Sequence, residues 1–195
     1  MSGFWDFFKI GFSNIVYLNV FVHILFIAAF CGIYTFKYTK LVAGFLLTFV
    51  CGYITTFLLS TFELISFPQG ILEYLLPLTI LVISVCNFFL KRNTFMNKYP
   101  PQNYRFYLGF ISGCIHGLAL PEVLKPLLTG DQLVMGILGF NLGIISALIL
   151  FVLFLLLVTF ILTYFIRVNI REWNLMLSGG CAGIALYIIA NKIFF

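Results

Sequence analysis

The sequence predicts an all-α fold, a polytopic membrane bundle of about six transmembrane helices preceded by an N-terminal interfacial helix. Of the 195 residues, 63% are hydrophobic and only 9% are charged, whereas a soluble domain carries about a quarter charged residues. The apolar residues also form runs long enough to cross a bilayer, and short polar loops separate these runs. We therefore expect a single integral membrane domain over residues 1–195.

Six apolar runs are candidate transmembrane spans. The fourth is short and ends at Pro121, and the fifth contains no charged residue. As one helix the fifth run would reach about 52 Å at 1.5 Å per residue, well beyond the ~30 Å hydrocarbon core. We expect one long helix there, tilted or broken, whose first part, "VMGILGFNLG", is irregular and buried in protein. The spans lie at about 17–36, 41–60, 71–90, 106–121, 132–166 and 173–191.

The basic residues predict the orientation of these spans. Eight of them fall in alternate loops on one side, and three fall on the other side. Because cytoplasmic loops carry the excess of lysine and arginine, both termini should lie outside the cytoplasm, in a bacterial inner membrane. The net charge of +5 thus reports topology and not a nucleic-acid partner. The eight are Lys37, Lys40, Lys91, Arg92, Lys98, Arg105, Arg167 and Arg171, and the three are Lys9, Lys125 and Lys192.

The segment 1–14 precedes the first span and contains "FWDFFKIGF". Its aromatic residues beside Asp6 and Lys9 are typical of an amphipathic helix at the outer interface of the membrane. A frayed tail is the alternative.

Glycines repeat every four residues on three of the spans. This spacing places them on one helical face and lets two backbones approach closely. We expect a compact bundle with the fourth span at its centre. The glycines are Gly109, Gly113 and Gly117 on the fourth span, Gly139 and Gly143 on the fifth, and Gly179 and Gly183 on the sixth.

Five polar residues from five different spans form a candidate cluster: His23, Tyr53, Glu73, His116 and Asn141. With the predicted orientation, all five lie within roughly the outer 10–12 Å of the membrane. Polar residues inside a membrane usually face the bundle interior and mark a functional site. A hydrogen-bonded structural network is an equally good reading, and a metal site of His23, Glu73 and His116 is a third.

Enzymatic chemistry has little support. Ser112 lies one helical turn before His116, as a nucleophile and base could, but no third residue would orient the imidazole. The five cysteines fall in apolar runs without CxxC spacing, which is typical of packing residues. We expect no catalytic residues, no cofactor and no resident metal.

The whole chain resembles the HupE/UreJ family of membrane proteins, which is linked to nickel or cobalt uptake. The similarity covers about residues 4–190, with agreement in the order and spacing of its landmarks. These landmarks are "FWDFFKIGFSNIVYLNVFVHILF", "LLTFVCGYITTFLL", "ILEYLLPLTILV", "GCIHGLALPEVLK", "FNLGI" and "REWNLMLSGGCAGI".

The resemblance also implies which metal ligands are missing. His23, Glu73 and the His116–Gly117 pair match family residues. Other His, Asp, Glu or Gln positions of the family are occupied here by Asn14, Tyr17, Val22, Tyr53, Ile145 and Leu148. A permease must remove the hydration water of its ion and bind the ion again, so it needs several metal ligands in succession. The resemblance therefore predicts a subunit or adaptor of a membrane protein complex, in contact with lipid and other subunits. A permease for nickel, cobalt or another small solute is the alternative.

Overall fold

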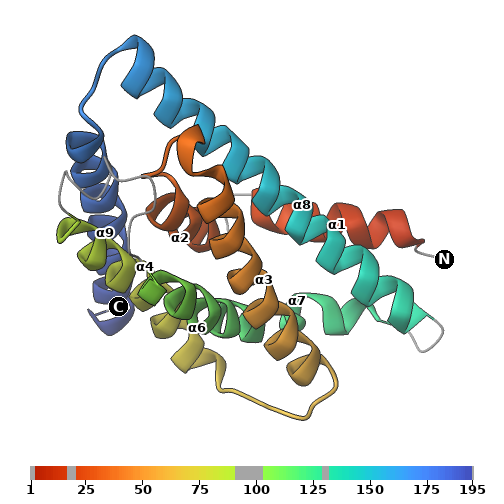
Figure 1. Cartoon of the computed structure of the whole chain (residues 1–195). Helices are drawn as coiled ribbons and strands as arrows, with labels where there is room; N and C mark the ends of the chain where they lie inside the picture. The colour runs from red at the N-terminus through yellow and green to blue at the C-terminus, as the bar shows by residue number, and fades with distance from the viewer. Residues whose placement is uncertain (1–2, 17–20, 91–102, 129–131, 195) are drawn as a thin grey trace.

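The computed structural model describes residues 3–16, 21–90, 103–128 and 132–194, and the regular elements in these ranges are helices (Figure 1). The predicted all-α membrane bundle is therefore confirmed. The α-helices are α1 (Phe4–Val16), α2 (Phe21–Cys31), α3 (Thr39–Thr61), α4 (Gln69–Phe88), α6 (Asn103–Ala119), α7 (Pro121–Leu124), α8 (Leu133–Phe160) and α9 (Ile170–Phe194). The shorter elements are the 3-10 helices η2 (Phe36–Tyr38) and η3 (Lys125–Leu127) and the π-helix η5 (Ile161–Phe165).

Five of the described helices are long and apolar enough to cross a membrane: Phe36–Thr61, Gln69–Phe88, Asn103–Leu127, Leu133–Phe165 and Ile170–Ile193. They coincide with the second to sixth predicted spans. The first predicted span differs. The α-helix in its described part, α2, has only 11 residues. At 1.5 Å per residue this helix is about 16 Å long, roughly half of the hydrocarbon core. Residues 17–20 lie outside the described residues.

The segment expected as an interfacial helix forms α1, and the structure adds a contact with α8 that the sequence did not suggest. Gly139 of α8 faces Phe4, and Gly143 faces Phe8. Because both residue numbers increase together, α1 runs parallel to α8, beside its first half (Figure 1). Trp5 remains 68% exposed on the opposite face of α1.

Helix α2 continues in the same direction as α1. Its Phe26 packs on Phe49 of α3, and its Phe30 packs on Phe45, so α2 is antiparallel to α3. Helix α8 is also antiparallel to α3, because Phe57 of α3 stacks on Phe140 of α8, whereas Phe36, just before α3, packs on Phe160 at the end of α8. Two short helices, α1 and α2, therefore run in one sense and together have the length that a single span needs.

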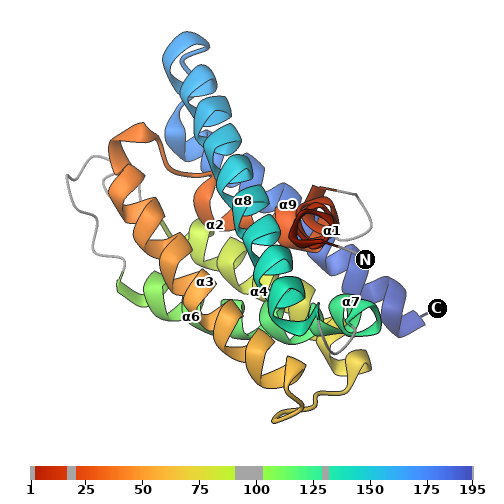
Figure 2. The same ribbon diagram turned by 90° about the vertical axis from the view of Figure 1, so that its right-hand side faces the viewer.

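Helix α8 is regular where the sequence predicted irregularity. The stretch "VMGILGFNLG" lies within one continuous helix from Leu133 to Phe160. Its glycines make room for α1 instead of breaking the helix, and in an apolar medium the backbone groups must stay paired within the helix. The irregular backbone lies after the C-terminal end of α8, in the π-helix η5 and at Arg167, whose φ is 61°. This end of α8 projects beyond the neighbouring helices in Figure 2.

Four helices share the tetrapeptide pattern Phe-x-x-Gly, and the structure joins them in two parallel pairs. In each pair, the carbonyl of one helix's Phe lies against the Gly of the other helix, reciprocally. Helices α1 and α8 pair through "FKIG" (8–11) and "FNLG" (140–143), and helices α3 and α6 pair through "FVCG" (49–52) and "FISG" (110–113). A side chain at any of these glycines would overlap the opposite backbone, which is the close approach that small residues permit in membranes.

The remaining predicted packing glycines divide into two groups. Gly109 and Gly117 of α6 also face α3. The structure differs from the expectation at Gly179 and Gly183 of α9, where an added Cβ would meet no atom within 4 Å. Four-residue spacing creates a smooth helical face but does not decide whether another helix covers it.

Candidate functional site

The structure brings two residues of the predicted polar cluster together at the bundle centre. The rings of His23 on α2 and His116 on α6 meet edge to face, with centroids 4.7 Å apart. They are 3% and 0% exposed. This proximity follows from the packing of α2 and α6 against the same face of α3, whose Phe49 contacts both helices.

One ring nitrogen of His116 is hydrogen-bonded to α4. Thr79 Oγ1 lies 3.1 Å from His116 Nε2 and 2.7 Å from the carbonyl oxygen of Leu76. The hydroxyl has a single hydrogen, so Nε2 donates to Thr79 when Thr79 donates to Leu76 O, and accepts from Thr79 otherwise. His116 Nδ1 is buried and has no hydrogen-bond partner among the described residues.

The surroundings of His116 are aromatic. The ring centroids of Phe26 and Phe49 lie 4.9 Å and 5.5 Å from that of His116. Such a shell offers no counter-charge, so it favours the neutral imidazole. Phe26 and Phe49 thus close two sides of His116, whose Nδ1 is the ring nitrogen without a described partner.

The other three residues of the predicted cluster do not complete a site with the histidines. Glu73 is about half exposed and forms an ion pair with Lys192 of α9. Asn141 donates to Ile137 O of its own helix at 2.8 Å. Tyr53 is buried, and its hydroxyl has no hydrogen-bond partner among the described residues.

The alternative metal set of His23, Glu73 and His116 is therefore not assembled. Within the described ranges, no group of three His, Cys, Asp or Glu side chains could hold a metal ion. The sequence placed Glu73 at a suitable depth, but depth does not determine which side of α4 it occupies.

A second polar cluster, which sequence reasoning missed, surrounds the fully buried Arg105 of α6. Its guanidinium donates from Nη1 to Asn87 Oδ1 and from Nη2 to Phe30 O, each at 2.6 Å. The rings of Phe30, Tyr34 and Phe45 surround it, with centroids 5.0, 5.4 and 5.7 Å from Cζ. The described residues provide no carboxylate partner for Arg105, since the ion pairs found there involve only lysines. Carbonyl dipoles and aromatic faces stabilise this charge instead.

Asn87 of α4 is the hub that extends this cluster to α9. Its Nδ2 donates to Ala29 O at 2.7 Å and to Ser178 Oγ at 2.9 Å. Its backbone carbonyl accepts hydrogen bonds from Asn174 and Arg171. We refer to Asn87, Arg105, Arg171, Asn174 and Ser178 as the Asn87–Arg105 network. It joins α2, α4, α6 and α9 near one end of the bundle.

Two features of the sequence concealed this network. Arg105 was counted among the loop cations, but α6 begins at Asn103 and places it inside the bundle. Asn87 falls inside the third predicted span, close to its end, and was not among the polar residues of the predicted cluster. An isolated asparagine in an apolar run, as at Asn87, is the signal that could have identified the network.

Comparison with known families adds to this geometry. The model of the family described as HupE / UreJ protein matches residues 1–192. The chain belongs to the HupE/UreJ family. No curated protein and no solved structure matches it significantly.

The expected metal-ligand positions of this HupE/UreJ protein can now be located. Asn14 and Val22 are half-buried on α1 and α2. Ile145 lines an apolar groove on α8, and Leu148 is buried. Tyr17 lies outside the described residues. The membrane character and family membership inferred from the sequence are confirmed.

Proposed function

We propose that this HupE/UreJ protein has lost metal transport and serves as a subunit or adaptor of a membrane protein complex. It resides in the bacterial inner membrane, with both termini on the non-cytoplasmic side. The observation that carries this proposal is the poor donor set around the histidine pair. Thr79 and phenylalanine rings surround His116, and Glu73 is paired with Lys192 at the surface.

The chemistry of ion transfer supports this reading. A first-row divalent ion that leaves water needs several nitrogen or oxygen ligands at each step. One imidazole pair supplies at most one ligand nitrogen per ring, two in all, and Glu73 is paired with Lys192 instead. The helix contacts, by contrast, are intact in the glycine pairs. A closely packed apolar body, in which the described residues form no group of three ligand-type side chains, suits a structural role.

A permease for nickel, cobalt or another small solute is the second candidate. A break in one helix favours it: α6 ends at Ala119 before the short α7. Discontinuous helices frequently form the binding sites of transporters near the middle of the bilayer. His116 lies within one helical turn of this break.

Co-purification and metal analysis distinguish the two candidates. The tagged protein is isolated in mild detergent, with mass spectrometry for proteins and elemental analysis for nickel, cobalt and zinc. A tagged membrane protein of similar size serves as the control for non-specific partners. We expect stoichiometric partner proteins and no stoichiometric metal. Bound nickel, cobalt or zinc that His23→Leu/His116→Leu abolishes, without a partner, would establish the permease instead.

A further inference from the structure

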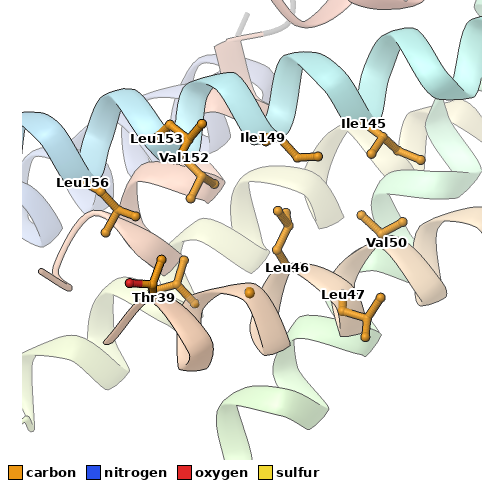
Figure 3. Close-up of a pocket in the computed structure, with 11 residues that line it drawn as sticks. Thr39, Leu46, Leu47, Val50, Ile145, Ile149, Val152, Leu153 and Leu156 are labelled. Carbon is orange, nitrogen blue, oxygen red and sulfur yellow. The ribbon is translucent and has the colours of Figure 1, made fainter. Parts of the chain in front are cut away.

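An apolar groove lies between α3 and α8 on the outside of the bundle, with a volume of about 370 Å³ (Figure 3). Leu47 and Leu153 on opposite walls are 63% and 49% exposed. Apart from Thr39 at one end, its walls are entirely aliphatic. The lining residues are Thr39, Val42, Ala43, Leu46, Leu47 and Val50 of α3, and Ile145, Ile149, Val152, Leu153 and Leu156 of α8.

The length of the groove matches one leaflet of a bilayer. Thr39 and Leu156 lie at one end, and Val50 and Ile145 lie at the other (Figure 3). From Thr39 to Val50, and from Ile145 to Leu156, each wall rises by about 16 Å at 1.5 Å per residue, against ~15 Å for half of the hydrocarbon core. Beyond Val50, α3 and α8 meet again where the rings of Phe57 and Phe140 stack, with centroids 5.9 Å apart. A transmembrane helix of another protein would need a groove through both leaflets.

The glycine pairs keep the groove open. Helix α3 is held against α6 through Gly52 and Gly113, and α8 is held against α1 through Gly11 and Gly143. Each helix therefore has its closest partner on a face other than the groove. Apart from Thr39, aliphatic side chains line the space between the α3–α6 pair and the α1–α8 pair, and an apolar chain would fill this space.

Two lysines lie at the end of the groove marked by Thr39. Lys40 directly follows Thr39, and Lys37 precedes it by two residues; both are exposed, and the Lys37 ammonium lies 5.5 Å from the Tyr38 ring centroid. Lys40 is on the same side of α3 as Ala43, one turn along the helix, and its long side chain can reach the membrane surface. Neither α3 nor α8 contains a carboxylate that could compete for these ammonium groups.

We propose that this groove binds one acyl chain of an anionic phospholipid, whose headgroup phosphate is held by Lys37 and Lys40. The aliphatic walls fit the chain, the length fits a single leaflet, and the two ammonium groups complement the negative headgroup. Under the positive-inside rule, this is the cytoplasmic leaflet.

Photo-crosslinking and native mass spectrometry test this proposal. The purified protein in a neutral detergent is mixed with phosphatidylglycerol or phosphatidylcholine that carries a photoactivatable group in the middle of one acyl chain. The variants are Lys37→Gln/Lys40→Gln, which removes the charges, and Ala43→Phe, which fills the groove. Lys9→Gln/Lys125→Gln removes two charges elsewhere and is the matched control.

We expect phosphatidylglycerol to label peptides of α3 and α8 and to be retained in preference to phosphatidylcholine. At about 1 kcal/mol per lysine, Lys37→Gln/Lys40→Gln should lower this preference roughly tenfold or more, whereas the control variant should keep it. Ala43→Phe should abolish labelling by both lipids.

Three results would overturn the proposal: equal retention of both lipids by the wild type, labelling confined to other helices, or cross-linked dimers joined at the groove. The lysine variant changes only exposed side chains, so the test holds even if Ala43→Phe disturbs packing.

Discussion

Replacement of Gly113 by alanine should separate the α3–α6 pair. A Cβ at this position would overlap the carbonyl oxygen of Phe49 and would lie 2.9 Å from its carbonyl carbon and 3.0 Å from Tyr53 N. These are backbone atoms, so no side-chain rotation can relieve the overlap. Ordinary van der Waals contact begins at 3.4 Å. The overlap with the Phe49 oxygen is the deepest of the three, so α6 must move away from α3 by roughly 1 Å.

The energetic cost follows from this displacement. A gap of about 0.5–1 Å loses a quarter to a half of each dispersion contact along the interface. Overpacking in a close-packed interior typically costs about 1–3 kcal/mol, and the lack of any flexible neighbour places Gly113→Ala toward the upper part of this range. For a chain of this size, about 2–3 kcal/mol corresponds to a decrease in Tm of roughly 4–12 °C.

Thermal unfolding in detergent, followed by circular dichroism, measures this effect. Gly179→Ala is the matched control, because an added Cβ there meets no atom within 4 Å. Alanine is favoured over glycine within a helix by up to about 1 kcal/mol, so the control should keep or raise Tm. If Gly113→Ala and Gly179→Ala unfold at the same temperature, the close backbone contact has no energetic importance and the reasoning is refuted.

Three further predictions concern the polar residues and the topology. Arg105→Lys should lower stability by about 1–3 kcal/mol in the same assay, since an ammonium lacks the planar fork that reaches Asn87 and Phe30 together; an unchanged Tm would contradict this. His116→Ala should also lower the free energy of unfolding by about 1–3 kcal/mol. The cellular content of nickel and cobalt, measured by elemental analysis, should stay constant, and a fall in either metal would favour the permease. A cysteine introduced at position 66 should react with an impermeant reagent outside intact cells, whereas one at position 96, outside the described residues, should not; labelling at 96 would reverse the topology.

The sequence predicted the class of fold because a chain that crosses a membrane several times consists mainly of apolar residues in long runs. Five of the six predicted spans correspond to helices of sufficient length, with boundaries shifted by only a few residues at most ends. The first span was the exception. Its apolar run continues beyond α2, but the helix ends at Cys31, and α2 alone is shorter than a bilayer span. Hydropathy does not show where a helix ends within an apolar run.

The sequence by itself thus determined the membrane character of the chain and the presence of small residues for close packing. These properties depend on position along the chain, which hydropathy and spacing report directly. Only the tertiary structure decided which faces of the helices meet. It joined His23 to His116 but left Glu73 with Lys192, and it buried Arg105 against Asn87. The physical reason is that rotation of each helix about its axis is set by packing between distant segments, and no local pattern contains that information.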